Sequence, residues 1–356
     1  MEPKKYEYID SLRGIAILMV ILVHTLTMLE YTAQYFSLGL RSIIHSSQHG
    51  VQLFFMVSAY TLTMSYYSRL GESRSNLKFF IRRFFRIAPM IYCILIYYIF
   101  YTIDWDLSRW QEISLTGLLT TITFSQTLFS NADVYFSGGW TVSVEFLFYC
   151  MLPFLCTRIK SLNSSIIFFL ITLLIAVVYE IFFKGLDFGF ILFYSSYTIF
   201  YQLPIFALGI LSYWITKDKE KKIDSRTLLF LIATTLFFCY ITIPYHVLFG
   251  FVFFFLIIML HQHQYKFLSN KILAKIGIVS YSMYIVHFPV IHLLNHIKFS
   301  SIFPANNFYI SCFHFIIMFI VVTAIAFLLA YITHKFIEVP GQNLGRKLIK
   351  KLDQQK

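Results

Sequence analysis

The stretch YIDSLRGIAILMVILVHT, residues 8–25, is long and apolar, yet it carries an aspartate, an arginine and a histidine. Arg13 and His24 are 11 residues apart. At about 3.6 residues per helical turn, this spacing places both on one helix face. With a rise of about 1.5 Å per residue, His24 lies about 16 Å beyond Arg13, near the middle of a hydrocarbon core about 30 Å thick. A titratable ring at that depth requires a partner or a function.

The composition is that of an integral membrane protein. Of 356 residues, 58% are hydrophobic, 20% aromatic and only 13% charged, which is too little polar surface for a soluble globule. The net charge of +12 is segregated by loop, which favours membrane topology over nucleic-acid binding. The five cysteines show no CxxC or Cys/His ligand spacing, so they are interpreted as packing residues, and no metal site is predicted.

Apolar segments long enough to cross a bilayer recur along the chain. They predict an all-α, polytopic membrane helix bundle of about ten transmembrane helices. A weaker segment at 114–129, rich in threonine and serine, is expected to be an interfacial or re-entrant helix. The ten segments are 12–30, 50–67, 87–103, 140–157, 165–183, 195–215, 227–243, 246–262, 276–297 and 309–334.

The lysines and arginines predict the orientation of this bundle, because cytoplasmic loops hold most of them. With both termini in the cytoplasm, 25 basic residues face inward and only four, Arg41, Arg109, Lys184 and Lys298, face outward. The predicted location is therefore the cell (inner or cytoplasmic) membrane. We expect one membrane domain over residues 1–340 and a short basic cytoplasmic tail over residues 341–356.

Three ionisable residues fall inside predicted spans, namely His24, Glu145 and His287. A charged side chain at mid-bilayer costs about 2.5 to 3.5 kcal/mol on insertion scales, so such groups usually face a cavity or a partner. Each alone is compatible with hydrogen-bonded packing, but three in different spans favour a functional site. The HxH pair at 261–263 has no third metal ligand of suitable spacing nearby.

The basic segment 68–89 has two interpretations. The positive-inside rule and attraction to anionic lipids explain a generic cluster. Alternatively, Arg83 and Arg86 form a phosphate site, because residues three apart are neighbours on a helix and guanidinium groups match phosphate geometry. That site would require a phosphorylated cytoplasmic ligand.

An ordered series of motifs resembles the membrane-bound acyltransferase 3 family, which includes bacterial O-antigen and exopolysaccharide O-acetyltransferases. The series starts with YIDSLRGIAILMVILVH, where ten residues separate Arg13 from His24, and it extends to about residue 341. Departures from the family pattern are Ala59 in place of glycine, and Thr141 and Val142 in place of Ser-Leu. The later motifs are GVQLFFMVSAYTL, RRFFRIAPMIY, GGWTVSVEFLFY, YSMYIVHFPV and FIEVPG.

The resemblance implies acyl transfer from a cytoplasmic acyl-CoA, usually acetyl-CoA, to a hydroxyl of a carbohydrate acceptor, either a lipid-linked or a surface glycan. Neutral imidazole suits removal of the hydroxyl proton, so His24 is the predicted base. The sequence leaves open whether His24 instead forms a transient acyl-imidazole. The phosphate groups of CoA would be bound by three arginines, namely Arg13, Arg83 and Arg86.

The other candidate catalytic residues are Asp10, Glu145 and His287. Asp10 lies near the predicted cytoplasmic end of the helix that carries His24. His287 belongs to the late YSxYLxHxP element. Glu145 could orient His24, stabilise its protonated form or bind the sugar, and the sequence leaves these roles open.

A rival function is a secondary transporter or a flippase of a polysaccharide intermediate, in which His24, Glu145 and His287 form a proton relay. Such transporters often contain inverted repeats and paired broken helices, and the sequence shows neither. A lipid-binding or assembly subunit would leave the buried ionisable groups unexplained.

Overall fold

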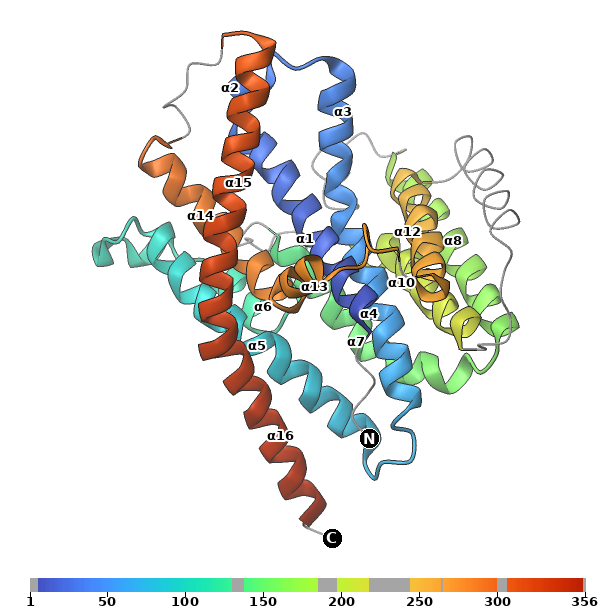
Figure 1. The fold of residues 1–356 in the computed structure, drawn as a ribbon. Helices are drawn as coiled ribbons and strands as arrows, with labels where there is room; N and C mark the ends of the chain where they lie inside the picture. The colour runs from blue at the N-terminus through green and yellow to red at the C-terminus, as the bar shows by residue number, and fades with distance from the viewer. Residues whose placement is uncertain are drawn as a thin grey trace. The chain divides into compact units, whose positions relative to one another are not determined.

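The computed structural model describes residues 6–129, 138–184, 197–217, 244–263, 265–299 and 306–354, and all regular secondary structure in these ranges is helical. The all-α prediction is therefore confirmed for this part of the chain (Figure 1). The longer helices are α1 (Glu7–Met28), α3 (Leu38–Ser46), α4 (Gly50–Tyr67), α5 (Ser75–Thr102), α6 (Leu115–Ile122), α7 (Gly139–Arg158), α8 (Leu162–Lys184), α10 (Ile199–Thr216), α12 (Tyr245–Gln262), α13 (Lys271–Ile278), α14 (Ser280–His296), α15 (Phe308–Thr333) and α16 (Val339–Gln354). Short pieces are α2 (Glu30–Ala33), the 3₁₀ turns η1 (Ser47–His49), η2 (Leu107–Glu112) and η3 (Gln126–Leu128), and the π-helical turn η5 (His334–Glu338).

The chain divides into two compact units, each described by itself below. Unit 1 contains the described residues of Phe55–Tyr265 and Gly341–Lys356. It therefore contains α5, α6, α7, α8, α10 and α12, with most of α4 and α16. Unit 2 contains Tyr6–Phe54 and Lys266–Pro340, and therefore α1 to α3 and α13 to α15.

Seven helices of the described residues are long and apolar enough to cross a membrane, or eight if the bent pair α13 and α14 counts as one span. Helix α4 coincides with the predicted span 50–67 but is not among the seven, and it carries several hydroxyl and amide side chains. The predicted span 227–243 lies outside the described residues. The count of about ten spans and the cytoplasmic termini remain predictions.

In unit 2, α13 crosses the start of α1 with the two backbones in contact. A Cβ atom at Gly277 would lie 1.7 Å from the carbonyl oxygen of Asp10, and one at Gly14 would lie 2.2 Å from that of Leu273. Only glycine permits so close an approach. The axis of α14 then turns by 73° from that of α13, so the predicted span 276–297 begins in the last residues of α13 and continues as α14 after a sharp bend.

Unit 2 also contains a buried carboxylate, Glu338, in the π-helical turn that follows α15. Its side chain is 1% exposed and accepts a hydrogen bond from the Ser282 hydroxyl of α14, at 3.0 Å. The ring nitrogen Nδ1 of His334 lies 2.9 Å from the same carboxylate oxygen. These contacts tie the first turn of α14 to the end of α15.

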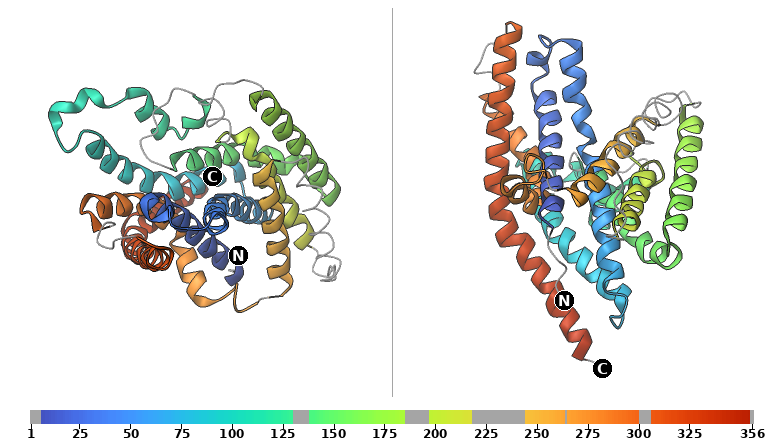
Figure 2. Two further views of the ribbon diagram at one scale, coloured as in Figure 1. Left: turned by 90° about the horizontal axis from the view of Figure 1, so that it is seen from above. Right: turned by 45° about the vertical axis from the view of Figure 1, so that its right-hand side comes forward.

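In unit 1, α5 begins at Ser75, twelve residues before the predicted start at 87, so the basic motif is part of the same helix. Gly138, with φ of 86°, precedes α7 in a left-handed conformation that suits glycine. The Ser143 hydroxyl of α7 donates to the Phe124 carbonyl, which fixes the segment after α6 against α7. Helix α10 packs against both α8 and α12 (Figure 2).

Candidate active site

Two histidines from separate helices meet in unit 2. The Nδ1 atom of His24 on α1 lies 3.2 Å from Nε2 of His287 on α14, and the two ring centroids are 5.1 Å apart. His287 is fully buried, whereas His24 is partly exposed. The Phe288 ring packs on both, 4.5 Å from His24 and 4.1 Å from His287 between centroids. The structure thus joins two of the residues predicted from sequence.

The hydrogen-bond network assigns the protons of this pair. The Nδ1 atom of His287 lies 2.6 Å from the Tyr284 carbonyl oxygen, which can only accept, so this nitrogen carries the hydrogen. In the neutral ring Nε2 is then an acceptor, and His24 donates to it through Nδ1–H. The Nε2 atom of His24 is therefore left with its lone pair, which is the form that a general base requires.

Asp10 and Arg13 form an ion pair on the first turns of α1. Arg13 Nη1 lies 3.1 Å from Asp10 Oδ1, and their side chains are 23% and 11% exposed. At about 1.5 Å per residue, Asp10 lies about 21 Å along α1 from His24. The carboxylate therefore contacts the arginine and is too distant to orient the imidazole directly.

Glu145 lies in unit 1, in a polar cluster formed by α4, α5 and α7. The Ser58 hydroxyl of α4 donates to its carboxylate at 2.5 Å. Tyr149, one turn further along α7 and 2% exposed, interacts electrostatically with Glu145, Arg83 and Arg86. The structure thus brings Glu145 together with the predicted arginine pair.

Arg83 has part of its guanidinium group buried. Its Nε atom is buried with no hydrogen-bond partner among the described residues, and its guanidinium carbon lies 6.0 Å from the centroid of the Phe79 ring. The charges of Arg86 and Glu145 act on it from nearby. A buried donor without a partner is costly, so this atom is poised to bind an anionic or acceptor group.

A family model for an acyltransferase domain, acyltransferase 3, matches residues 6–334. The chain belongs to the acyltransferase 3 family. Comparison with curated proteins and with solved structures gave no match.

The residues matched to the acyltransferase 3 family include every candidate predicted from the sequence, from Asp10 to His287. The match ends one residue beyond α15, so α16 lies outside it. Among the described residues, no group of three or more His, Cys, Asp and Glu side chains could hold a metal ion.

Two residues of the polar cluster, Ser58 and Tyr149, were not identified from the sequence. Tyr149 follows Glu145 by four residues, a spacing that places both on one helix face, and this signal was available in the motif GGWTVSVEFLFY. Ser58 comes from another helix, and no pattern in the sequence relates it to Glu145. Only the packing of α4 against α7 reveals that contact.

Proposed function

We propose that the protein is an integral membrane O-acyltransferase that moves an acetyl group from cytoplasmic acetyl-CoA to a hydroxyl of a cell-surface carbohydrate, such as an O-antigen or exopolysaccharide. The observation that carries this proposal is the histidine pair. His24 is partly exposed with a lone pair on Nε2, while the fully buried His287 lies behind it. Family membership supplies the acyltransferase class.

In this mechanism, His24 Nε2 takes the proton of the sugar hydroxyl while the hydroxyl oxygen attacks the thioester carbonyl carbon. The tetrahedral intermediate collapses with cleavage of the carbon–sulfur bond, and the CoA thiolate leaves. The imidazolium then returns its proton to the thiolate, which regenerates neutral His24. His287 accepts from Nδ1–H of His24 and so stabilises the imidazolium and fixes the ring orientation.

The arginines bind the phosphate groups of the donor. Arg83 and Arg86 on α5 present guanidinium groups suited to phosphate oxygens, and the Nε atom of Arg83 gains the acceptor that it otherwise lacks. Arg13, held by Asp10, makes a further contact to the donor. Glu145, Ser58 and Tyr149 hold the arginine pair in place, and this role of Glu145 differs from the three that the sequence left open.

Purified protein in detergent tests the proposal directly. With acetyl-CoA and a polysaccharide acceptor, we expect free CoA thiol and acetylated acceptor in equal amounts, measured by a thiol reagent and by mass spectrometry. Surface glycans from cells with and without the gene then identify the acceptor. Release of neither product from folded protein, in the presence of glycans from the native host, would rule out the proposed reaction.

A transporter remains the second candidate, because two histidines in contact can also relay protons. In sealed vesicles that contain the protein, a transporter would move a lipid-linked glycan in response to a proton gradient without consuming acetyl-CoA. We expect the opposite, namely acetyl-CoA consumption that does not require a gradient.

A further inference from the structure

Helix α16 packs against the amino-terminal half of α5, within unit 1. A Cβ atom at Gly341 would lie 2.5 Å from the Pro89 ring, and one at Gly345 would lie 2.9 Å from the Phe85 side chain. Two glycines four residues apart thus bring the backbone of α16 directly onto α5. The contact involves residues beyond those matched to the acyltransferase 3 family.

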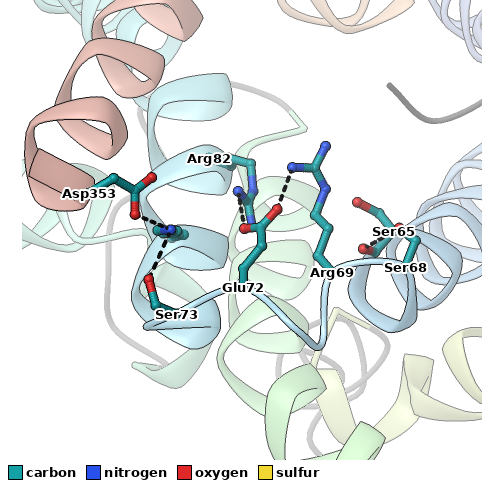
Figure 3. A network of polar contacts seen from close by, with 8 residues as sticks. Ser65, Ser68, Arg69, Glu72, Ser73, Arg82 and Asp353 are labelled. Carbon is teal, nitrogen blue, oxygen red and sulfur yellow. Dashed lines mark hydrogen bonds and ion pairs between the residues drawn. The ribbon is translucent and has the colours of Figure 1, made fainter. Parts of the chain in front are cut away.

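An ion pair between a buried lysine and an exposed aspartate joins the two helices near the carboxyl-terminal end of α16. Lys78 Nζ of α5 lies 2.5 Å from Asp353 Oδ1 of α16, and their side chains are 6% and 47% exposed (Figure 3). A lysine near the amino end of a helix opposes the helix dipole, and a buried ammonium group without a partner is strongly unfavourable. Lys78 Nζ also lies 3.5 Å from the Ser73 hydroxyl, and Asp353 supplies its charged partner. The ion pair therefore fixes the position of α16 along α5.

The loop before α5 is held at the same end. The Glu72 carboxylate accepts from Arg69 and from Arg82, each at 3.1 Å, and lies between the two guanidinium groups (Figure 3). Arg82 follows Lys78 by one helical turn on α5. The start of α5 is thus fixed both by its preceding loop and by α16.

This contact orients the arginine pair. Lys78, Phe85 and Pro89 recur at helical spacing and form the face of α5 that meets α16. At about 100° per residue, Arg86 lies about 80° and Arg83 about 140° around the helix from Lys78. A helix held on one face cannot rotate, so Arg86 keeps a fixed direction to the side of this face and Arg83 keeps one toward the opposite side of α5.

We propose that α16 is a positioning element, and that its docking through Lys78 and Asp353 presents Arg83 and Arg86 to the phosphate groups of the acyl donor. The ligand in this inference rests on the proposed function, whereas the docking itself does not. Lys78 and Asp353 are positioning residues because they act through α5 and touch no reacting group.

Charge reversal and charge exchange test this role. The variants are Asp353→Lys, Lys78→Asp and the double exchange, with Asp353→Asn as a milder variant and Lys350→Asp as a control on the exposed face of the same helix. Each is purified in detergent and checked by size exclusion. Two readouts are hydrogen–deuterium exchange of peptides 79–90 and 341–354, and steady-state kinetics with acetyl-CoA.

We expect both single reversals to raise exchange in both peptides and to raise KM for acetyl-CoA by about fivefold or more, with kcat changed by less than about twofold. Asp353→Asn should give smaller changes of the same kind. The double exchange should restore protection and KM, and Lys350→Asp should change neither. A purely structural role would lower active protein and kcat without this selective effect on KM.

The inference is overturned if the reversals expose 341–354 but leave peptide 79–90 and KM unchanged, or if the double exchange rescues nothing although it folds. Failure of the proposed function would differ, because it would show in the wild-type protein as absent turnover of acetyl-CoA. In that case, hydrogen–deuterium exchange of peptide 79–90 still tests whether α16 fixes the orientation of α5.

Discussion

At the scale of single residues, the two histidines differ in environment more than in chemistry. His24 is partly exposed and His287 is fully buried, so only the first is placed to meet a substrate. The carbonyl of Tyr284 fixes the proton of His287, which in turn fixes that of His24. Two identical side chains thus acquire the separate roles of base and positioning residue from their positions alone.

The first prediction concerns this division of roles. His24→Ala should lower the rate of acetyl transfer by about 10² to 10⁴, because general-base catalysis contributes that much. His287→Ala should cost less, and the double variant should be no slower than His24→Ala, since both act in one unit. The measurement is CoA release by purified variants at equal amounts of folded protein.

His296→Ala is the matched control, because His296 lies exposed at the end of α14. It should retain wild-type activity. Near-normal acetylation by a well-expressed His24→Ala variant would remove His24 from the mechanism.

The second prediction concerns pH and Glu72, in the loop before α5. Burial alone would raise the pKa of its carboxyl, but the charges of Arg82 and Arg69 outweigh burial and lower the pKa below the ordinary value. A carboxyl whose pKa is lower in the folded state stabilises the protein above its unfolded pKa, and this stability is lost as the pH falls through the folded pKa.

Wild-type protein should therefore unfold at a higher temperature than Glu72→Gln above the ordinary pKa of a glutamate, about 4.3, and the difference should shrink as the pH falls below it. Thermal unfolding in detergent across this pH range measures it. Arg69→Gln should reduce the same difference. A gap between wild type and Glu72→Gln that widens as the pH falls would contradict the assigned ion pairs.

At the scale of elements, α5 combines a membrane-crossing helix with the basic motif at its start. Because the helix begins at Ser75, Arg83 and Arg86 are held in a rigid turn rather than in a mobile loop. Helix α7 adds Glu145 and Tyr149 to the same cluster. The arginines therefore have fixed neighbours, which a cluster present only for membrane orientation does not need.

The third prediction separates these two interpretations of the arginine pair. The double change of Arg83 and Arg86 to lysine keeps the charge but removes the planar bidentate group. A lost charge-assisted contact costs about 1.5 to 3 kcal/mol, so KM for acetyl-CoA should rise by about tenfold or more. Saturation kinetics on solubilised protein measure this change.

Arg74→Lys is the control, because Arg74 is exposed and precedes α5. It should leave KM unchanged. If the double lysine variant inserts correctly and also keeps its KM, the pair serves topology alone.

The fourth prediction concerns the crossing of α1 and α13. Gly277→Ala places a Cβ atom 1.7 Å from the Asp10 carbonyl oxygen, so the two helices must separate. We expect a loss of about 3 kcal/mol or more in stability, together with lost activity, because α1 carries His24.

Gly39→Ala provides the comparison, since a Cβ atom at this position would meet no other atom within 4 Å. In a helix, this change should leave stability equal or raise it by about 0.5 kcal/mol. The measurement is thermal unfolding of both variants in the same detergent. Equal unfolding temperatures for Gly277→Ala and Gly39→Ala would refute the close crossing of α1 and α13.

At the scale of the whole molecule, the distribution of basic residues predicts how the chain sits in the membrane. Of the lysines and arginines, 25 fall on the side assigned to the cytoplasm and four on the other. The basic helix α16 follows α15 without a break in a helical run of 47 residues, Phe308–Gln354. The arginine pair and the carboxyl-terminal helix are both assigned to the cytoplasmic side, where acyl-CoA is found.

The fifth prediction tests this orientation. A reporter fused after Lys356 should be cytoplasmic, and one inserted next to Lys184 should be external, because cytoplasmic segments retain the basic residues. A paired alkaline phosphatase and fluorescent-protein fusion at each position gives opposite signals on the two sides. The reverse pattern at both positions would overturn the assigned topology.

The sequence by itself determined the helical membrane class, the family and the candidate residues, because these depend on local hydropathy and on motifs within single segments. It predicted a helix wherever an apolar run was long, as over α1, α7 and α15. Tertiary structure decided which side chains meet: His24 with His287, Glu145 with Ser58, and Lys78 with Asp353. These pairs are separated by 87 to 275 residues in the chain. Such contacts depend on how helices pack, and local periodicity within one segment carries no information about its distant neighbour.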